Sequence, residues 1–155
     1  KGITFWFTFP YKAPEKPVRE DVIFEKIKVE KDKLTVLIAE DNAGNFKLFE
    51  TILKNDYTIV HAWNGKEAVE LFKEYEPHIV LMDINMPEMN GYEATKEIRK
   101  LSEVIPIIAV TAYAFASDEE QVMNSGFDAY ASKPLNASAL KKQMVDLLRA
   151  RVFVI

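Results

Sequence analysis

An uninterrupted apolar run, Ile79 to Met82, ends on a single carboxylate, Asp83. A run this short does not suit a helix, and without polar alternation it favours a strand that is buried on both faces of a parallel sheet. Pro87 and the pair Asn90-Gly91 indicate that a loop follows this strand. Asp83 is therefore predicted to lie at the carboxyl end of a buried strand, which is the edge where open α/β sheets bind their ligands.

From residue 34 onward, apolar runs alternate with amphipathic helical stretches. The strands are predicted at residues 34–39, 57–61, 106–110 and 127–131, in addition to the run that begins at Ile79. The helices are predicted at residues 43–54, 64–75, 91–101, 117–124 and 136–151, with Asn64 as the N-cap of the second. Strict alternation of this kind predicts an α/β fold, a doubly wound parallel sheet with right-handed crossovers and helices on both faces.

The amino-terminal residues follow a different pattern. Residues 1–9 alternate apolar with polar side chains, which predicts a strand with one strongly apolar face. The prolines that follow, separated by Lys and Glu, favour an extended, semi-rigid linker. We expect residues 1–11 to be the last strand of a preceding, truncated domain, 12–33 a linker, 34–151 one domain and 152–155 a C-terminal tail. In the alternative interpretation, the first strand belongs to the main domain.

The composition argues against several classes of protein. Lys and Arg number 20 against 24 Asp and Glu, and a net charge of -4 does not suit a protein that binds nucleic acid directly. Cysteine is absent, so neither disulfides nor thiolate metal ligands are available. No apolar run approaches the roughly 20 residues that a membrane helix needs. We expect a soluble fragment of a longer protein.

Polar residues interrupt the pattern where the predicted strands end. They are Glu40, Asp41, Asp83, Thr111 and Lys133. Converging carboxylates raise one another's pKa, so Glu40, Asp41 and Asp83 together favour a bound cation, and oxygen ligands favour Mg²⁺. In the alternative interpretation Glu40 and Asp41 only cap the following helix. That reading leaves the coincidence of Asp83, Thr111 and Lys133 at the same sheet edge unexplained.

The motifs around these residues resemble those of receiver domains, the phospho-accepting modules of two-component response regulators. They read Ala-Glu-Asp-Asn at 39–42, Leu-Met-Asp-Ile-Asn-Met-Pro at 81–87, Val-Thr-Ala-Tyr-Ala at 110–114 and Ser-Lys-Pro-Leu at 132–135. These motif sequences are most similar to those of receivers that are fused to hybrid histidine kinases. The resemblance covers the chain from Leu34 to about Arg149. This resemblance implies a flavodoxin-like fold with strand order 2-1-3-4-5.

The resemblance also implies a role for each site residue. Asp83 would be the phosphorylated residue, Glu40 and Asp41 the acidic pair around Mg²⁺, the backbone carbonyl of Asn85 a further metal ligand, Thr111 the hydroxyl switch, Tyr130 the switch aromatic and Lys133 the cation on the phosphoryl oxygens. A cis peptide bond between Lys133 and Pro134 is implied as well. Phosphate on Asp83 would then change the face made by the helix at 117–124, the strand at 127–131 and the last helix.

Phosphoryl transfer consists mainly of positioning and charge neutralisation, so these residues are nearly all the chemistry requires. The implied donor is a phosphohistidine on a kinase dimerisation domain or a histidine phosphotransfer protein. The receiver would catalyse its own phosphorylation and dephosphorylation. His61 and His78 adjoin predicted strands, and we expect them to be structural or surface residues rather than the donor.

Residues 1–10 resemble the last strand of the ATP-binding domain of sensor histidine kinases. The parent protein is therefore expected to be a bacterial hybrid histidine kinase, a transferase anchored in the inner membrane with its carboxy-terminal domains in the cytoplasm. A weak homodimer is a further expectation.

Two other functions fit the same fold. In aspartate-nucleophile hydrolases a second Asp, two residues after the nucleophile, acts as general acid, but Asn85 occupies that place here and cannot exchange a proton in the same way. A flavin-binding or small-ligand module is the second alternative. Such a module would not need Asp83, Thr111 and Lys133 together.

Overall fold

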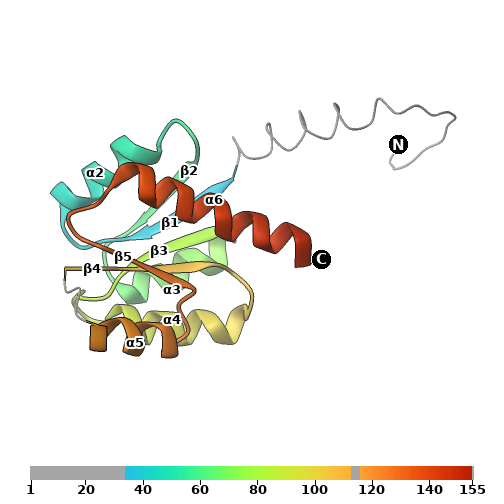
Figure 1. Cartoon of the computed structure of the whole chain (residues 1–155). Helices are drawn as coiled ribbons and strands as arrows, with labels where there is room; N and C mark the ends of the chain where they lie inside the picture. Colours follow the sequence, from blue (N-terminus) through green and yellow to red (C-terminus); the bar gives the residue numbers. More distant parts are fainter. Residues whose placement is uncertain (1–33, 113–115, 155) are drawn as a thin grey trace, which may run out of the picture. The chain divides into compact units, whose positions relative to one another are not determined.

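The computed structural model describes residues 34–112 and 116–154 (Figure 1). The strand predicted at 1–11 and the linker predicted at 12–33 lie outside the described residues. The described part contains a five-stranded parallel sheet in the order β2-β1-β3-β4-β5, which confirms the predicted fold. The strands are β1 (Thr35–Ala39), β2 (Thr58–Ala62), β3 (Ile79–Asp83), β4 (Ile107–Thr111) and β5 (Ala129–Ser132). The helices are α2 (Ala43–Leu53), α3 (Gly65–Tyr75), α4 (Gly91–Leu101), α5 (Ala116–Asn124) and α6 (Ala137–Val154).

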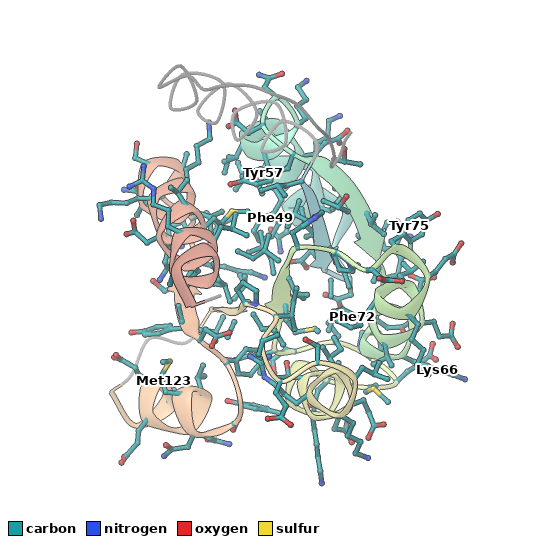
Figure 2. The ribbon with its side chains drawn as sticks, turned by 90° about the vertical axis from the view of Figure 1, so that its right-hand side faces the viewer. Phe49, Tyr57, Lys66, Phe72, Tyr75 and Met123 are labelled. Atoms are coloured by element: carbon teal, nitrogen blue, oxygen red, sulfur yellow. The ribbon has the colours of Figure 1, made fainter. Side chains whose placement is uncertain are left out.

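Helices cover both faces of the sheet, and each face has its own apolar core (Figure 1). Alternate residues of each central strand contribute to opposite cores, because successive side chains of a strand point to opposite faces. Phe49 of α2 and Met144 of α6 pack on one face, while Phe72 of α3 and Ile98 of α4 pack on the other. Figure 2 shows Phe49 and Phe72 on the two sides of the sheet. The two cores fix the central strands and therefore the positions of their carboxyl ends.

An asparagine caps the amino end of each of the helices α2, α3 and α4. The side chain of Asn42 accepts from Asn45 N, that of Asn64 from Glu67 N, and that of Asn90 from Glu93 N. Asn64 is the N-cap that its sequence context predicts. The capping box, with reciprocal side-chain and backbone bonds, occurs at Asn90 and Glu93. Each cap sets the helix start directly after a loop that follows the carboxyl end of a strand.

The carboxy-terminal elements differ from the prediction at their ends. Strand β5 begins at Ala129 rather than 127, because the Asp128 side chain accepts from Ile107 N and from Arg99 and so ties the preceding residues to β4 and α4. Helix α6 continues to Val154, beyond the end predicted at residue 151, and so includes residues 152–154 of the predicted tail. Neither Gly nor Pro follows residue 151, so the sequence contains nothing that ends the helix there.

Within the described ranges, none of the helices combines the length and apolar character needed to cross a membrane.

Candidate functional site

The residues singled out at the strand ends lie at one edge of the sheet. Asp83 is the last residue of β3 and Thr111 the last of β4, while Glu40 directly follows β1 and Lys133 directly follows β5. Asp83 and Thr111 are buried, and Glu40 is fully buried. The carboxyl ends of four parallel strands thus bring these groups into one cluster, although Glu40 and Lys133 are 93 residues apart in the sequence.

Lys133 joins two of the carboxylates. Its Nζ donates to Asp83 Oδ2 at 3.0 Å and to Glu40 Oε2 at 3.1 Å. Burial by itself lowers the pKa of Lys133, but the hydrogen bonds and charges of Asp83 and Glu40 outweigh it and raise the pKa above its usual value. The ammonium group is therefore a fixed positive charge beside Asp83.

Glu40 is held at both carboxylate oxygens. Its Oε1 accepts from Asn42 N at 3.0 Å and its Oε2 from Lys133. Burial raises the pKa of Glu40 to about 6, and the negative charge of Asp83 adds to the rise. The hydrogen bonds from Asn42 and Lys133 act in the opposite direction without cancelling it. The site therefore favours additional positive charge.

The carboxylates of Glu40, Asp41 and Asp83 fit a divalent cation. One oxygen from each lies within 4.8 Å of the others, with Glu40 and Asp83 buried and Asp41 exposed. All three donors are hard oxygens, the ligand type that Mg²⁺ prefers, and the exposed side leaves room for water ligands. Asn85 N donates to Asp83 Oδ1 at 3.1 Å, which orients the carboxylate and places the Asn85 backbone beside it.

A tightly folded loop follows Asp83. Gly91 N donates to Ile84 O at 2.8 Å, and a Cβ at Gly91 would lie 2.4 Å from Asp83 O. Gly65 N donates to Met89 O at 3.0 Å, and a Cβ at Gly65 would lie 2.2 Å from that same oxygen. Only glycine permits these approaches. The backbone of the loop thus closes onto the strand end that carries Asp83.

The two predicted switch residues occupy neighbouring strands. The backbone O of Thr111 accepts from Lys133 N at 2.8 Å, and Thr111 pairs in register with Ser132. Tyr130 is half-buried, and its hydroxyl donates to Glu119 Oε2 of α5 at 3.1 Å. This hydrogen bond raises the pKa of the Tyr130 hydroxyl. The peptide bond between Lys133 and Pro134 is cis, as the resemblance implied.

Two contacts near the site were not predicted from the sequence. His61 Nε2 lies 2.9 Å from the backbone O of Glu40, and Glu119 bonds Tyr130. No local motif marks either residue, because both contacts join different elements. The His61 contact depends on the pairing of β2 with β1, and the Glu119 contact on the position of α5 beside β5. His78, by contrast, accepts from Thr35 N at 3.0 Å near the amino ends of the strands, away from the site.

Comparison with known proteins agrees with this geometry. The sequence profile of the response regulator receiver domain matches residues 36–145. The polar-differentiation response regulator DivK of Brucella anthropi is 43% identical over 105 residues, which make up 66% of this chain and 85% of DivK.

Solved structures give the same family. The receiver domain of a sensor histidine kinase from Pseudomonas aeruginosa, with magnesium coordinated in its active site cleft, is 30% identical with a TM-score of 0.70, covering 75% of this chain and 98% of that one. A second match is the co-crystal structure of the Saccharomyces cerevisiae histidine phosphotransfer protein Ypd1 and the receiver domain of Ssk1. The matched chain is 32% identical to this one with a TM-score of 0.71, and the match covers 77% of this chain and 92% of that one.

Proposed function

Since this chain belongs to the response regulator receiver family, the phosphoryl-accepting domains of two-component signalling, we propose that Asp83 is its phosphoacceptor. The observation that carries the proposal is the Lys133 ammonium group, which bonds Asp83 Oδ2 and Glu40 Oε2 at the end of the sheet. A buried carboxylate beside a fixed cation, with further carboxylates in reach of a shared metal ion, is suited to accept a phosphoryl group.

The transfer proceeds by attack of an Asp83 carboxylate oxygen on phosphorus. The new O–P bond forms as the N–P bond to the donor histidine breaks, and the electron pair of that bond stays on the imidazole nitrogen. Bound Mg²⁺ would neutralise charge on the phosphoryl oxygens. Glu40, Asp41, Asp83 and the carbonyl of Asn85 are the groups that would hold it. Lys133 offsets charge on a phosphoryl oxygen, and the Thr111 hydroxyl donates to another.

The magnesium ion in the Pseudomonas aeruginosa receiver supports the same metal in this chain. The pairing of a receiver with Ypd1 supports a histidine phosphotransfer protein, or the dimerisation domain of a kinase, as the donor. Direct contact with nucleic acid is not part of the proposal, because the net charge is -4.

The phosphorylated state is proposed to last long enough to signal. A hydrolase would need a general acid two residues after the nucleophile, and Asn85 has a neutral amide there. Incubation with a small-molecule phosphodonor and Mg²⁺, followed by intact-mass measurement, tests this. One stable phosphate per chain is expected. Continuous phosphate release without an adduct would indicate the hydrolase, and no reaction at all would favour a small-ligand module.

Replacement of Thr111 by Ala is expected to leave phosphate uptake in place and to uncouple it from the face made by α5, β5 and α6. The Thr111 hydroxyl, drawn toward a phosphoryl oxygen, leaves space into which Tyr130 can turn, and this biases a two-state element. Amide NMR shifts are compared with and without a phosphoryl mimic. Shifts in α5 and β5 of the variant as large as those of the parent would contradict this route.

Replacement of Glu119 by Gln is expected to lower the pKa of Tyr130 toward its ordinary value. The Glu119 carboxylate accepts a hydrogen bond from the Tyr130 hydroxyl and disfavours a phenolate beside it. The pKa is measured by NMR of ring-labelled tyrosine over a pH series. Glu120→Gln is the control, since Glu120 is an exposed neighbour on the same helix. An equal pKa in the parent and in the Glu119 variant would show that this contact does not hold Tyr130.

We further propose that the chain comes from a hybrid histidine kinase, with residues 1–11 the last strand of an ATP-binding domain, 12–33 a linker and the receiver from residue 34 onward. The support is the Gly-Ile-Thr-Phe-Trp-Phe-Thr-Phe-Pro wording at 2–10 and the kinase origin of the Pseudomonas aeruginosa receiver. The residues encoded before Lys1 test it. A histidine-bearing helical hairpin and an ATP-binding domain are expected there, and their absence would contradict the proposal. A bacterial, membrane-anchored parent and weak self-association of the receiver belong to the same proposal.

A further inference from the structure

Residues of the edge strand β2 hold the backbone of Glu40 at both its N–H and its carbonyl. Glu40 N donates to Ala62 O at 3.0 Å, and the Glu40 carbonyl lies 2.9 Å from His61 Nε2. Pairing between β1 and β2 ends at Ala39 and Ala62, so the Glu40 carbonyl lies beyond the paired strand residues. A side chain therefore holds the first carbonyl after the strand. Because a carbonyl only accepts hydrogen bonds, Nε2 of His61 carries the proton and donates it.

Two aromatic rings fix the orientation of the His61 ring. The Phe46 ring of α2 stacks on it with centroids 3.6 Å apart and planes 7° apart. The Trp63 ring contacts it at a centroid distance of 4.2 Å and an angle of 51°. Trp63 is itself attached at its backbone, since Trp63 N donates to the carboxylate of Glu67. His61 is thus confined by neighbours from α2 and from the loop after β2, and it does not need to order itself when a ligand binds.

The bond to Glu40 acts on the peptide group between the two acidic residues. The Glu40 carbonyl and the Asp41 N–H belong to one planar unit, so fixing the carbonyl fixes the direction in which the chain leaves toward Asp41. The Glu40 side chain has its own partners in Asn42 N and Lys133, whereas the Asp41 side chain is exposed. Asp41 therefore depends on the backbone for its placement. Mg²⁺ requires near-octahedral coordination with metal–oxygen distances of about 2.0–2.1 Å. Its binding is therefore sensitive to the position of the Asp41 carboxylate.

We propose that His61 is a positioning residue for the divalent-cation site: through the Glu40 carbonyl it sets Asp41 relative to Glu40 and Asp83. This inference rests on the proposed function, because it concerns the cation that the phosphoryl transfer uses. His61 makes no contact with the reacting atoms in this role. It preorganises the acidic pair before the cation arrives, in the way that partners of metal ligands tune metal affinity.

The test compares two substitutions that separate the hydrogen bond from the packing. His61→Phe keeps an aromatic ring for Phe46 and Trp63 but removes the donor, and His61→Gln keeps an N–H donor but removes the ring. Mg²⁺ dissociation constants are measured by calorimetry without any phosphodonor. We expect His61→Phe to weaken Mg²⁺ binding about tenfold, as for the loss of other partners of metal ligands, and His61→Gln to stay within about threefold of the parent.

The matched control is His78→Gln, because His78 bonds Thr35 N near the amino ends of the strands and should leave Mg²⁺ affinity unchanged. In the phosphodonor reaction, His61→Phe should need more Mg²⁺ but reach the maximal rate of the parent. In the metal-free proteins, NMR should show the His61 Nε2 proton in the parent and altered Asp41 and Asn42 amide signals in His61→Phe. If the role of His61 were purely structural, His61→Phe would lower the thermal stability of the protein. It would not weaken Mg²⁺ affinity while leaving the maximal rate of phosphorylation unchanged.

The phosphoacceptor function and the positioning role of His61 can be contradicted separately. If the parent protein binds no Mg²⁺ and takes no phosphate, the proposed function is wrong. If the parent does both but His61→Phe binds Mg²⁺ as tightly, the positioning role is overturned. Equal weakening in His61→Phe and His61→Gln would overturn it too, because the retained donor would then have no effect.

Discussion

Asp83→Asn is expected to abolish phosphate uptake from every donor. The amide has no carboxylate oxygen with which to attack phosphorus, and nucleophile removal cannot be compensated by the neighbouring groups. Lys133 keeps its bond to Glu40 Oε2 in this variant, so the folded site should survive. The measurement is intact mass after incubation with a small-molecule phosphodonor and Mg²⁺, with circular dichroism to establish that the variant is folded.

Asp41→Asn is the matched control, since Asp41 belongs to the same acidic cluster but lies exposed and is assigned to the metal alone. It should take up phosphate more slowly at low Mg²⁺ and recover as Mg²⁺ is raised. Glu40→Gln should behave in the same direction. Persistent uptake by Asp83→Asn, or complete loss in Asp41→Asn at every Mg²⁺ concentration, would overturn the division between nucleophile and metal ligands.

Gly91→Ala is expected to destabilise the domain by about 3 kcal/mol, the cost typical of overpacking against rigid neighbours. The added Cβ would lie 2.4 Å from Asp83 O and 2.8 Å from Ile84 Cα, so the backbone itself must move. The corresponding fall in melting temperature is about 10 °C. Because the displaced atoms include the carbonyl of Asp83, the rate of phosphate uptake should fall as well. Thermal denaturation and the phosphodonor reaction measure the two effects.

Gly44→Ala serves as the control for Gly91→Ala. Gly44 also lies in the first turn of a helix, but its added Cβ would meet only Asn42 Oδ1, at 3.2 Å. Better helix propensity and crowding of the cap oppose one another there, so the net change should stay within about 1 kcal/mol. Equal losses of stability at Gly44 and Gly91 would show that contact with the Asp83 backbone is not the cause.

The strands of the sheet were predictable because their signals are local, whereas their order was implied by the resemblance to receiver domains. The apolar run from Ile79 to Met82 needs no knowledge of other elements to be interpreted as a buried strand, and all of its residues are buried. Asn64 indicates a helix start because its side chain can accept a hydrogen bond from a backbone N–H of the first turn. The start of β5 was not predictable in this way. It depends on Arg99 and Ile107, which reach Asp128 across 29 and 21 residues of chain.

The candidate site likewise contains residues that local sequence signals predict and a contact that they do not. Glu40, Asp83, Thr111 and Lys133 follow apolar runs, so topology alone brings them to one edge. The contact of His61 with Glu40 was missed, since it appears only when β2 is paired in register with β1. Long-range side-chain contacts of this kind leave no periodicity or motif in the sequence.

The bond of Lys133 to two carboxylates has a consequence for the order of events at the site. Three carboxylates against one ammonium leave two negative charges, although the Glu40 carboxyl, with a pKa of about 6, gives up its proton only near neutrality. An incoming phosphoryl group is itself anionic and is repelled by this surplus. One divalent cation cancels it in full. Ion binding should therefore precede productive docking of the donor, and adding monovalent salt, which screens charge without occupying the site, should not substitute for it.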